Sequence, residues 1–249
     1  MNGEVAQICN IALASRSALK TKNKISYIPS KYENKIEFLF TENYKAENVN
    51  EWYDYCIEKG LEDIKLLMPI SVKDPNLLGF ANTSQASLVC FFKNSLITYF
   101  TPNWQYKNNA WNIIYTEYKW ENPPKEKPKF SDNTEDFKNI LSRIASFADK
   151  IDFHNFANIF IEAFNILNGK SIENIKNNFF EQYFFELPEI NKRLFYASNI
   201  SDVFGGMGSW NDCPPFSASE RGLENEYKNL SSELLTQIRL ALLYSVNEW

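Results

Sequence analysis

The residues best suited to chemistry or recognition form one tract near the C-terminus. Glycine is favoured where φ must be positive, or where another backbone or a ligand comes too close for a Cβ atom. Three of the eight glycines in the chain lie in this tract, which indicates either a demanding turn or a contact surface. The tract consists of Gly205, Gly206, Met207, Gly208, Ser209, Trp210, Asn211 and Asp212.

Phosphate binding is one chemistry that such a glycine tract could perform. The run from Gly206 to Ser209 resembles a phosphate-cradling loop, but it lacks the Gly-Lys-Ser/Thr ending of those loops. It also follows a predicted helix, whereas a phosphate loop follows a strand. It continues into Pro214-Pro215, which we do not expect to start a helix directly. Phosphate binding is therefore disfavoured.

The single histidine, His154, is a second candidate for catalysis. Imidazole can act as a general base, but Ser-His-Asp or Cys-His catalysis also needs a positioned nucleophile. The sequence places no such nucleophile beside His154. A helix cap or a partly exposed surface group is the commoner role. We therefore assign no catalytic residue.

Metal and cofactor motifs are sparse. The cysteines have wide, unrelated spacings and no neighbouring histidine, and the EF-hand, HExxH and Walker patterns are absent. We expect reduced and mostly buried thiols, no metal site and no cofactor. The four cysteines are Cys9, Cys56, Cys90 and Cys213.

Charge and aromatic content bear on the class of partner. Residues 131–249 carry 10 basic and 17 acidic side chains, which disfavours nucleic acid and would attract a basic partner. Ordinary solvated helix faces are the simpler explanation. Several aromatic residues could stack on bases or sugars, but few lysines interleave with them, so a sheet core is expected. They are Tyr99, Phe100, Trp104, Tyr106, Trp111, Tyr115 and Trp120.

The elements that must position these residues change character along the chain. Apolar spacing predicts helices over 4–20 and 49–59, with Gly60 ending the second. β-Branched and aromatic residues predict an antiparallel meander of three strands over 87–120. Two shorter strands are expected before it, over 25–28 and 35–40.

Prolines and charges mark residues 122–133 as a Pro/Lys-rich linker, and helical spacing follows it. Gly169 is expected to end the second of five helices, and Ser171 to cap the third. The predicted helices span 137–151, 156–167, 172–184, 188–204 and 223–246.

The predicted fold class is therefore α+β. An N-terminal part, 1–121, contains helices and the antiparallel meander, and a C-terminal part, 134–249, is a helical array. The two parts either form separate domains or pack as one globular unit. No run of about 18 apolar residues and no secretion signal is present, so we expect a cytoplasmic protein that does not enter membranes.

Two interpretations of the glycine tract remain open. In the first, the helix before it ends at Phe204, Gly205 takes a left-handed conformation, and Trp210 is buried with its indole N–H bonded to a carbonyl. In the second, Met207 and Trp210 are exposed anchors of a partner surface, with Asn211 and Asp212 as polar complement.

The tract also resembles bacterial proteins in which a helix runs into Gly-Gly-Met-Gly-Ser, then Phe or Trp, then Asn-Asp, before a long closing helix. These families are functionally uncharacterised, and some members resemble immunity proteins that neutralise partner toxins. The chain departs from the pattern at Pro214-Pro215, where a hydrophobic run is commoner, and in its large N-terminal part. The resemblance implies a binding protein.

Three functional hypotheses follow. The first is a cytoplasmic, non-catalytic immunity protein that binds a protein partner, such as a basic toxin, through its acidic helical half. The second is an enzyme with a site near His154 or within 209–212. The third is a structural or assembly protein, with a dimer through the last helix as one form.

Overall fold

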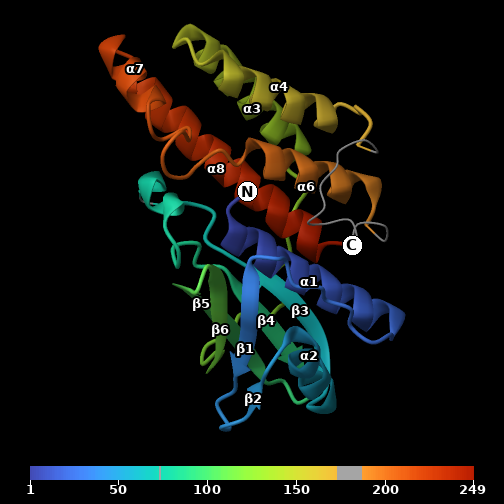
Figure 1. The fold of residues 1–249 in the computed structure, drawn as a ribbon. Coiled ribbons are helices and arrows are strands. Elements are labelled where there is room, and N and C mark those ends of the chain that lie inside the picture. The colour runs from blue at the N-terminus through green and yellow to red at the C-terminus, as the bar shows by residue number, and fades with distance from the viewer. Residues whose placement is uncertain (73, 173–186) are drawn as a thin grey trace.

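The computed structural model describes residues 1–72, 74–172 and 187–249 of the chain. Within these residues, seven α-helices accompany a six-stranded mixed sheet, which confirms a mixed helix and sheet protein with a helical C-terminal part. Figure 1 shows the sheet at one end of the molecule, the helical array at the other, and α1 (Gly3–Thr21) between them. No helix in the described ranges is long and apolar enough to cross a membrane.

The sheet has the strand order β2-β1-β6-β5-β4-β3. β4, β5 and β6 pair antiparallel in sequence, as expected for the meander. However, β1 pairs parallel with β6, so the sheet is mixed and wider than a three-stranded meander. The strands are β1 (Glu33–Leu39), β2 (Lys45–Ala46), β3 (Leu61–Leu67), β4 (Ser87–Phe92), β5 (Ile97–Lys107) and β6 (Ala110–Lys119).

Two strand predictions need correction. Residues 25–28 form no strand, although Ile25 and Tyr27 are buried, and the following Pro29 has no N–H to donate to a ladder. Conversely, the edge strand β3 was not predicted. It includes Glu62 and Asp63, residues that are depleted in strands, which conceals the strand pattern in the sequence.

One face of the sheet packs against α1 and α2 (Val49–Glu58). Phe38 of β1 stacks between two rings, with centroid distances of 4.6 Å to Trp52 and 4.7 Å to Tyr115. Phe100 meets Phe38 edge-on. Because α1 is covered along most of its length, it belongs to the interior of the molecule more than to its surface.

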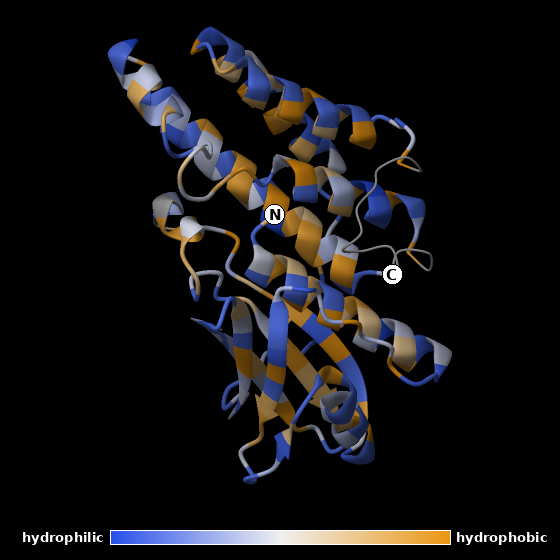
Figure 2. Ribbon diagram, in the orientation of Figure 1, coloured by the Kyte–Doolittle hydropathy of each residue, from blue (hydrophilic) through white to orange (hydrophobic). Residues whose placement is uncertain are grey.

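Four of the five predicted helices are found in the described part of the helical half, and α7 is a further helix that starts at Pro214, where none was expected. Its described helices are α3 (Thr134–Lys150), α4 (His154–Leu167), α6 (Glu189–Ser201), α7 (Pro214–Glu220) and α8 (Glu224–Asn247). The helix predicted over 172–184 lies outside the described residues except for Ile172. Figure 2 shows that the C-terminal half of α8 is mostly hydrophobic, whereas its beginning near α7 is more hydrophilic.

The two parts are joined by the C-terminal end of α8. The Asn247 side chain accepts from the Leu66 N–H and donates to the Leu66 carbonyl, both at 2.8 Å. Arg16 of α1 donates to the Asn247 carbonyl at 2.8 Å, and Lys65 pairs with Glu248 at 2.9 Å. The outer edge of β3 is therefore hydrogen-bonded at Leu66 by a side chain of the last helix.

Candidate functional site

The glycine tract is a loop between α6 and α7, and its backbone differs from the prediction. Helix α6 ends at Ser201 with Asp202 as its C-cap, three residues before Phe204. Gly205 is not left-handed; the glycine with positive φ is Gly208, at 80°. The chain therefore leaves the helix early, and its sharpest reversal comes in the middle of the tract.

Polar side chains of the tract bind its own backbone. The Asn211 Oδ1 atom accepts from the Gly205 N–H and from the Ser209 hydroxyl, each at 2.9 Å. Asp212 Oδ2 accepts from the Gly208 N–H at 2.7 Å. Because these oxygens close the loop, Asn211 and Asp212 act as turn-forming residues.

Trp210 is a core residue, with none of its surface exposed. Its ring meets Phe156 and Phe160 edge-on at 5.3 Å and stacks on Tyr227 at 5.5 Å. Its indole N–H donates to the Ser231 hydroxyl at 2.8 Å, where a carbonyl had been expected. The interpretation of Trp210 as an exposed anchor is therefore wrong, and that of a buried ring is confirmed.

Met207 has the opposite surroundings. Its surface is 98% exposed, at the tip of the loop. The two glycines before Met207 pack closely against Gly79 of the N-terminal part. The backbones are so close that a Cβ atom added to Gly79 would lie 2.8 Å from Gly205 C and Gly206 N. Gly79 ends a short 3-10 helix, η1 (Pro75–Gly79). The tract is thus fixed against η1, and the close approach requires a glycine that the sequence had not singled out.

Further bonds hold the two loops and the N-terminus together. Asn211 Nδ2 donates to the Pro75 carbonyl at 3.2 Å, which links the tract to η1. Asn2 donates through its side chain to the Leu78 carbonyl at 2.9 Å and through its backbone to Asp202 Oδ2 at 3.2 Å. Segments far apart in sequence are therefore held side by side.

Large apolar side chains are exposed on η1 and the residue that follows it, on the tract, and on α7. We call this group the joint patch; it consists of Leu77, Phe80, Met207 and Phe216. Residues 74–92 and 194–220, which carry the patch, contain no Lys, Arg or His. Their acidic residues are Asp74, Asp202, Asp212 and Glu220.

A cavity of about 460 Å³ lies beside the joint patch, between η1, α7 and α8, and we call it the α7–α8 cavity. Ser231, the acceptor for Trp210, lines it. The Glu224 carboxylate on its wall binds Lys228 at 2.6 Å, and this hydrogen bond lowers the pKa of Glu224. The lining residues are Val72, Asp74, Pro75, Asn211, Pro215, Ser219, Glu224, Tyr227, Lys228, Ser231 and Ser232.

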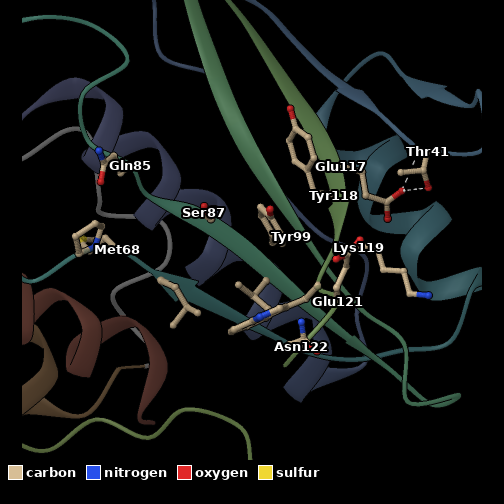
Figure 3. A pocket seen from close by; sticks show the side chains of 14 residues that line it. Thr41, Met68, Gln85, Ser87, Tyr99, Glu117, Tyr118, Lys119, Glu121 and Asn122 are labelled. Atoms are coloured by element: carbon tan, nitrogen blue, oxygen red, sulfur yellow. Dashed lines mark hydrogen bonds between the residues drawn. The ribbon is translucent and has the colours of Figure 1, made fainter. Parts of the chain in front are cut away.

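A more open hollow of about 910 Å³ lies over the sheet and is drawn in Figure 3. Tyr99 and Tyr118 stack there at 5.5 Å, whereas the Glu117 carboxylate is turned toward Thr41 and accepts from its N–H and hydroxyl at 3.0 Å. Of the seven aromatic residues expected in the sheet core, three are buried, and Tyr106 is exposed. The buried ones are Phe100, Trp104 and Tyr115.

His154 and the cysteines add no reactive group to either cavity. His154 is the first residue of α4, largely exposed, and its Nδ1 atom lies 2.8 Å from Asp149 Oδ1. This hydrogen bond raises the pKa of His154. All four cysteines are free thiols, and only Cys213, directly after the tract, is exposed. Among the described residues, no group of three or more His, Cys, Asp or Glu could hold a metal ion.

Comparison of the chain with protein-family profiles, curated proteins and solved structures gives no match. The resemblance of residues 205–212 to tracts of immunity-like proteins therefore stays an expectation.

Proposed function

We propose that this chain is a non-catalytic binding protein that neutralises a basic protein toxin in the cytoplasm, in the manner of a bacterial immunity protein. The observation that carries the proposal is Met207, a large apolar side chain held almost fully in solvent on a loop with fixed neighbours. Exposed apolar side chains that gather on neighbouring segments, as those of the joint patch do on η1, the tract and α7, are a common mark of a protein contact. The resemblance of the tract to immunity-like proteins agrees with it.

The fixed geometry of the loop supports a binding role. Trp210 holds one end of the tract in the helical core, and Gly205 and Gly206 lie against Gly79 on the other side. A partner that contacts Met207 would therefore meet a surface that is already ordered. Preorganised contacts cost less conformational entropy on binding than mobile ones do.

The excess of acidic side chains in the helical part and around the joint patch supports a basic partner. The segments that carry the joint patch have four acidic residues and no basic ones, and residues 131–249 carry seven more acidic than basic side chains. An acidic surface of this kind accelerates encounter with a basic protein and disfavours acidic ones. Apolar side chains on acidic segments would give such a partner both electrostatic steering and buried contact area.

The proposal is tested by co-expressing this chain with the protein encoded by the neighbouring gene. We expect a complex that survives size-exclusion chromatography, and protection of cells that otherwise stop growing when that protein is expressed alone. Light scattering on the same column gives the stoichiometry and shows whether the chain alone is a dimer. Absence of both the complex and the protection would remove the proposal.

Replacing Met207 with Asp should weaken the complex by at least about fivefold, since loss of an apolar contact on which binding depends costs more than about 1 kcal/mol. The matched control is Ile28→Asp, which makes the same change at an exposed apolar residue of the N-terminal part. Binding by isothermal titration calorimetry should be unchanged in the control. Equal weakening by both variants would point to a different contact surface.

A further inference from the structure

We infer that the α7–α8 cavity receives an arginine side chain of the bound partner. This inference rests on the proposed function and names a site at which the partner would be recognised. The cavity opens between η1, α7 and α8, next to the segments that bear Met207 and Phe216. Its volume of about 460 Å³ is in the range of pockets that enclose small ligands, so one long side chain fits within it.

The lining offers hydrogen-bond acceptors on several sides. Asp74 comes from the segment before η1, and Glu224 from the first turn of α8. Hydroxyl groups come from α7 and α8, through Ser219 and Ser232. A guanidinium group has five N–H donors in a planar fork and no acceptor, so a wall of carboxylates and hydroxyls suits it.

Apolar parts of the lining suit the rest of an arginine side chain. Val72, Pro75 and Pro215 contribute aliphatic surface from η1, its preceding segment and α7. Arginine buries its methylene stem along apolar surface while its head group stays with polar partners. Outside the cavity, Phe216 and Met207 provide apolar contact for the residues that flank the arginine.

Among the described residues of the lining, Lys228 is the cationic one, and its charge repels a second cation. Its ammonium group binds Glu224 at 2.6 Å, and the lining otherwise carries the Asp74 and Glu224 carboxylates. An incoming guanidinium would share or replace that ion pair. Removing Lys228 should therefore strengthen arginine binding, whereas removing either carboxylate should weaken it.

Trp210 provides a spectroscopic reporter for the cavity. Its indole N–H donates to Ser231, whose side chain lines the cavity, and the Tyr227 hydroxyl, on a lining residue, donates to the Trp210 carbonyl. A ligand in the cavity should move the indole N–H resonance. The Trp210→Phe variant assigns that resonance among the six tryptophans.

The test is a titration of the full chain with N-acetyl-L-arginine methylamide, followed by NMR at the Trp210 indole N–H. The probe for comparison is N-acetyl-L-citrulline methylamide, which has nearly the same shape but no charge. We expect a saturable shift with the arginine probe and none with the citrulline probe. Asp74→Asn and Glu224→Gln should weaken binding by about two- to fivefold each, as for partly exposed ion pairs. Lys228→Gln should tighten it.

Equal shifts with the two probes, or arginine binding that none of the three variants changes, would overturn the inference. All three positions are exposed, so the variants leave the core intact. The outcome is separable from that of the proposed function. Failure of the arginine probe with a stable toxin complex removes only the cavity assignment. Specific arginine binding without any complex removes only the immunity role.

Discussion

At the scale of single residues, Trp210 and Met207 perform different tasks although they lie three positions apart. Trp210 has no exposed surface and contacts rings from α4 and α8, whereas Met207 is 98% exposed. The Trp210 side chain stabilises the fold, because it fills the space between helices. The exposed Met207 side chain contributes no such packing, which is why the binding proposal depends on Met207.

Alanine variants should separate these two tasks. Trp210→Ala should lower the free energy of unfolding by about 3–5 kcal/mol, because it leaves a large cavity and a Ser231 hydroxyl without its donor. Met207→Ala should change it by no more than about 0.5 kcal/mol. Urea denaturation followed by circular dichroism measures both. A Trp210→Ala protein as stable as wild type would contradict the core assignment.

His154 permits a clean test of surface electrostatics because it is the only histidine. The hydrogen bond that the ring donates to Asp149 should hold the pKa of His154 above the ordinary value of about 6.5. The ion pair then contributes stability below pH of about 6.5 and loses it as the pH rises through the raised pKa. A ¹H NMR titration should show this pKa, and Asp149→Asn should lower it. An unchanged pKa in that variant would contradict the contact.

The sequence predicted the turn in the tract but not which of its side chains are buried. It predicted that the tract is a turn, since three glycines and two Asx residues favour one, and Asn211 and Asp212 do bind its backbone. It did not decide whether Trp210 is buried. That depends on rings contributed by two other helices, Phe160 of the distant α4 and Tyr227 of α8, whose packing around Trp210 local spacing does not encode.

At the scale of elements, the contact between η1 and the tract determines how the site is held. Gly79 lies against Gly205 and Gly206 so closely that no side chain fits between the two backbones. The two loops belong to different parts of the chain, and Asn211 adds a hydrogen bond to Pro75. The position of Met207 therefore depends on a residue of the N-terminal part.

Two glycine variants test that contact. Gly79→Ala should lower the free energy of unfolding by about 1–3 kcal/mol, because its Cβ atom would overlap the backbone of the tract. Gly206→Ala should be tolerated, since nothing lies within 4 Å of its Cβ position and its φ is not positive. Thermal unfolding followed by circular dichroism compares the two. Similar melting temperatures would mean that the loops do not touch.

Most elements could be predicted because their apolar spacing is regular. The last helix was predicted over 223–246 and spans Glu224–Asn247, and Gly60 and Gly169 do have positive φ after their helices. Pro214 was misjudged: it starts α7 directly, because a proline in the first turn of a helix loses no hydrogen bond. The parallel pairing of β1 with β6 is a long-range contact that local spacing does not encode.

At the scale of the whole molecule, the end of α8 connects the helical part to the sheet. Asn247 pairs with both backbone groups of Leu66, and its carbonyl accepts from Arg16. Lys20 lies 3.9 Å above the Trp249 ring. These contacts, the contact between η1 and the tract, and the hydrogen bond from Arg239 to the Pro69 carbonyl join the two parts at several places. A partner bound to the joint patch would touch segments from both parts of the chain.

Asn247→Ala should therefore reduce the stability of the whole chain and not only that of the last turn of α8. The variant leaves the N–H and the carbonyl of Leu66 buried without their partner, which costs about 1–3 kcal/mol. The matched control is Asn229→Ala, an exposed position on the same helix. Urea denaturation should show a lower midpoint for Asn247→Ala alone.

Hydrogen exchange on the same pair of variants locates the effect. In Asn247→Ala, faster exchange is expected at Leu66 and its neighbours in β3, because the Leu66 N–H then has lost the hydrogen bond that holds the strand to α8. The amides of Gly205 and Gly206 should also exchange faster if the contact at the end of α8 and the contact between η1 and the tract stabilise each other. Faster exchange confined to the last turn of α8 would instead mean that each part holds its structure without the other.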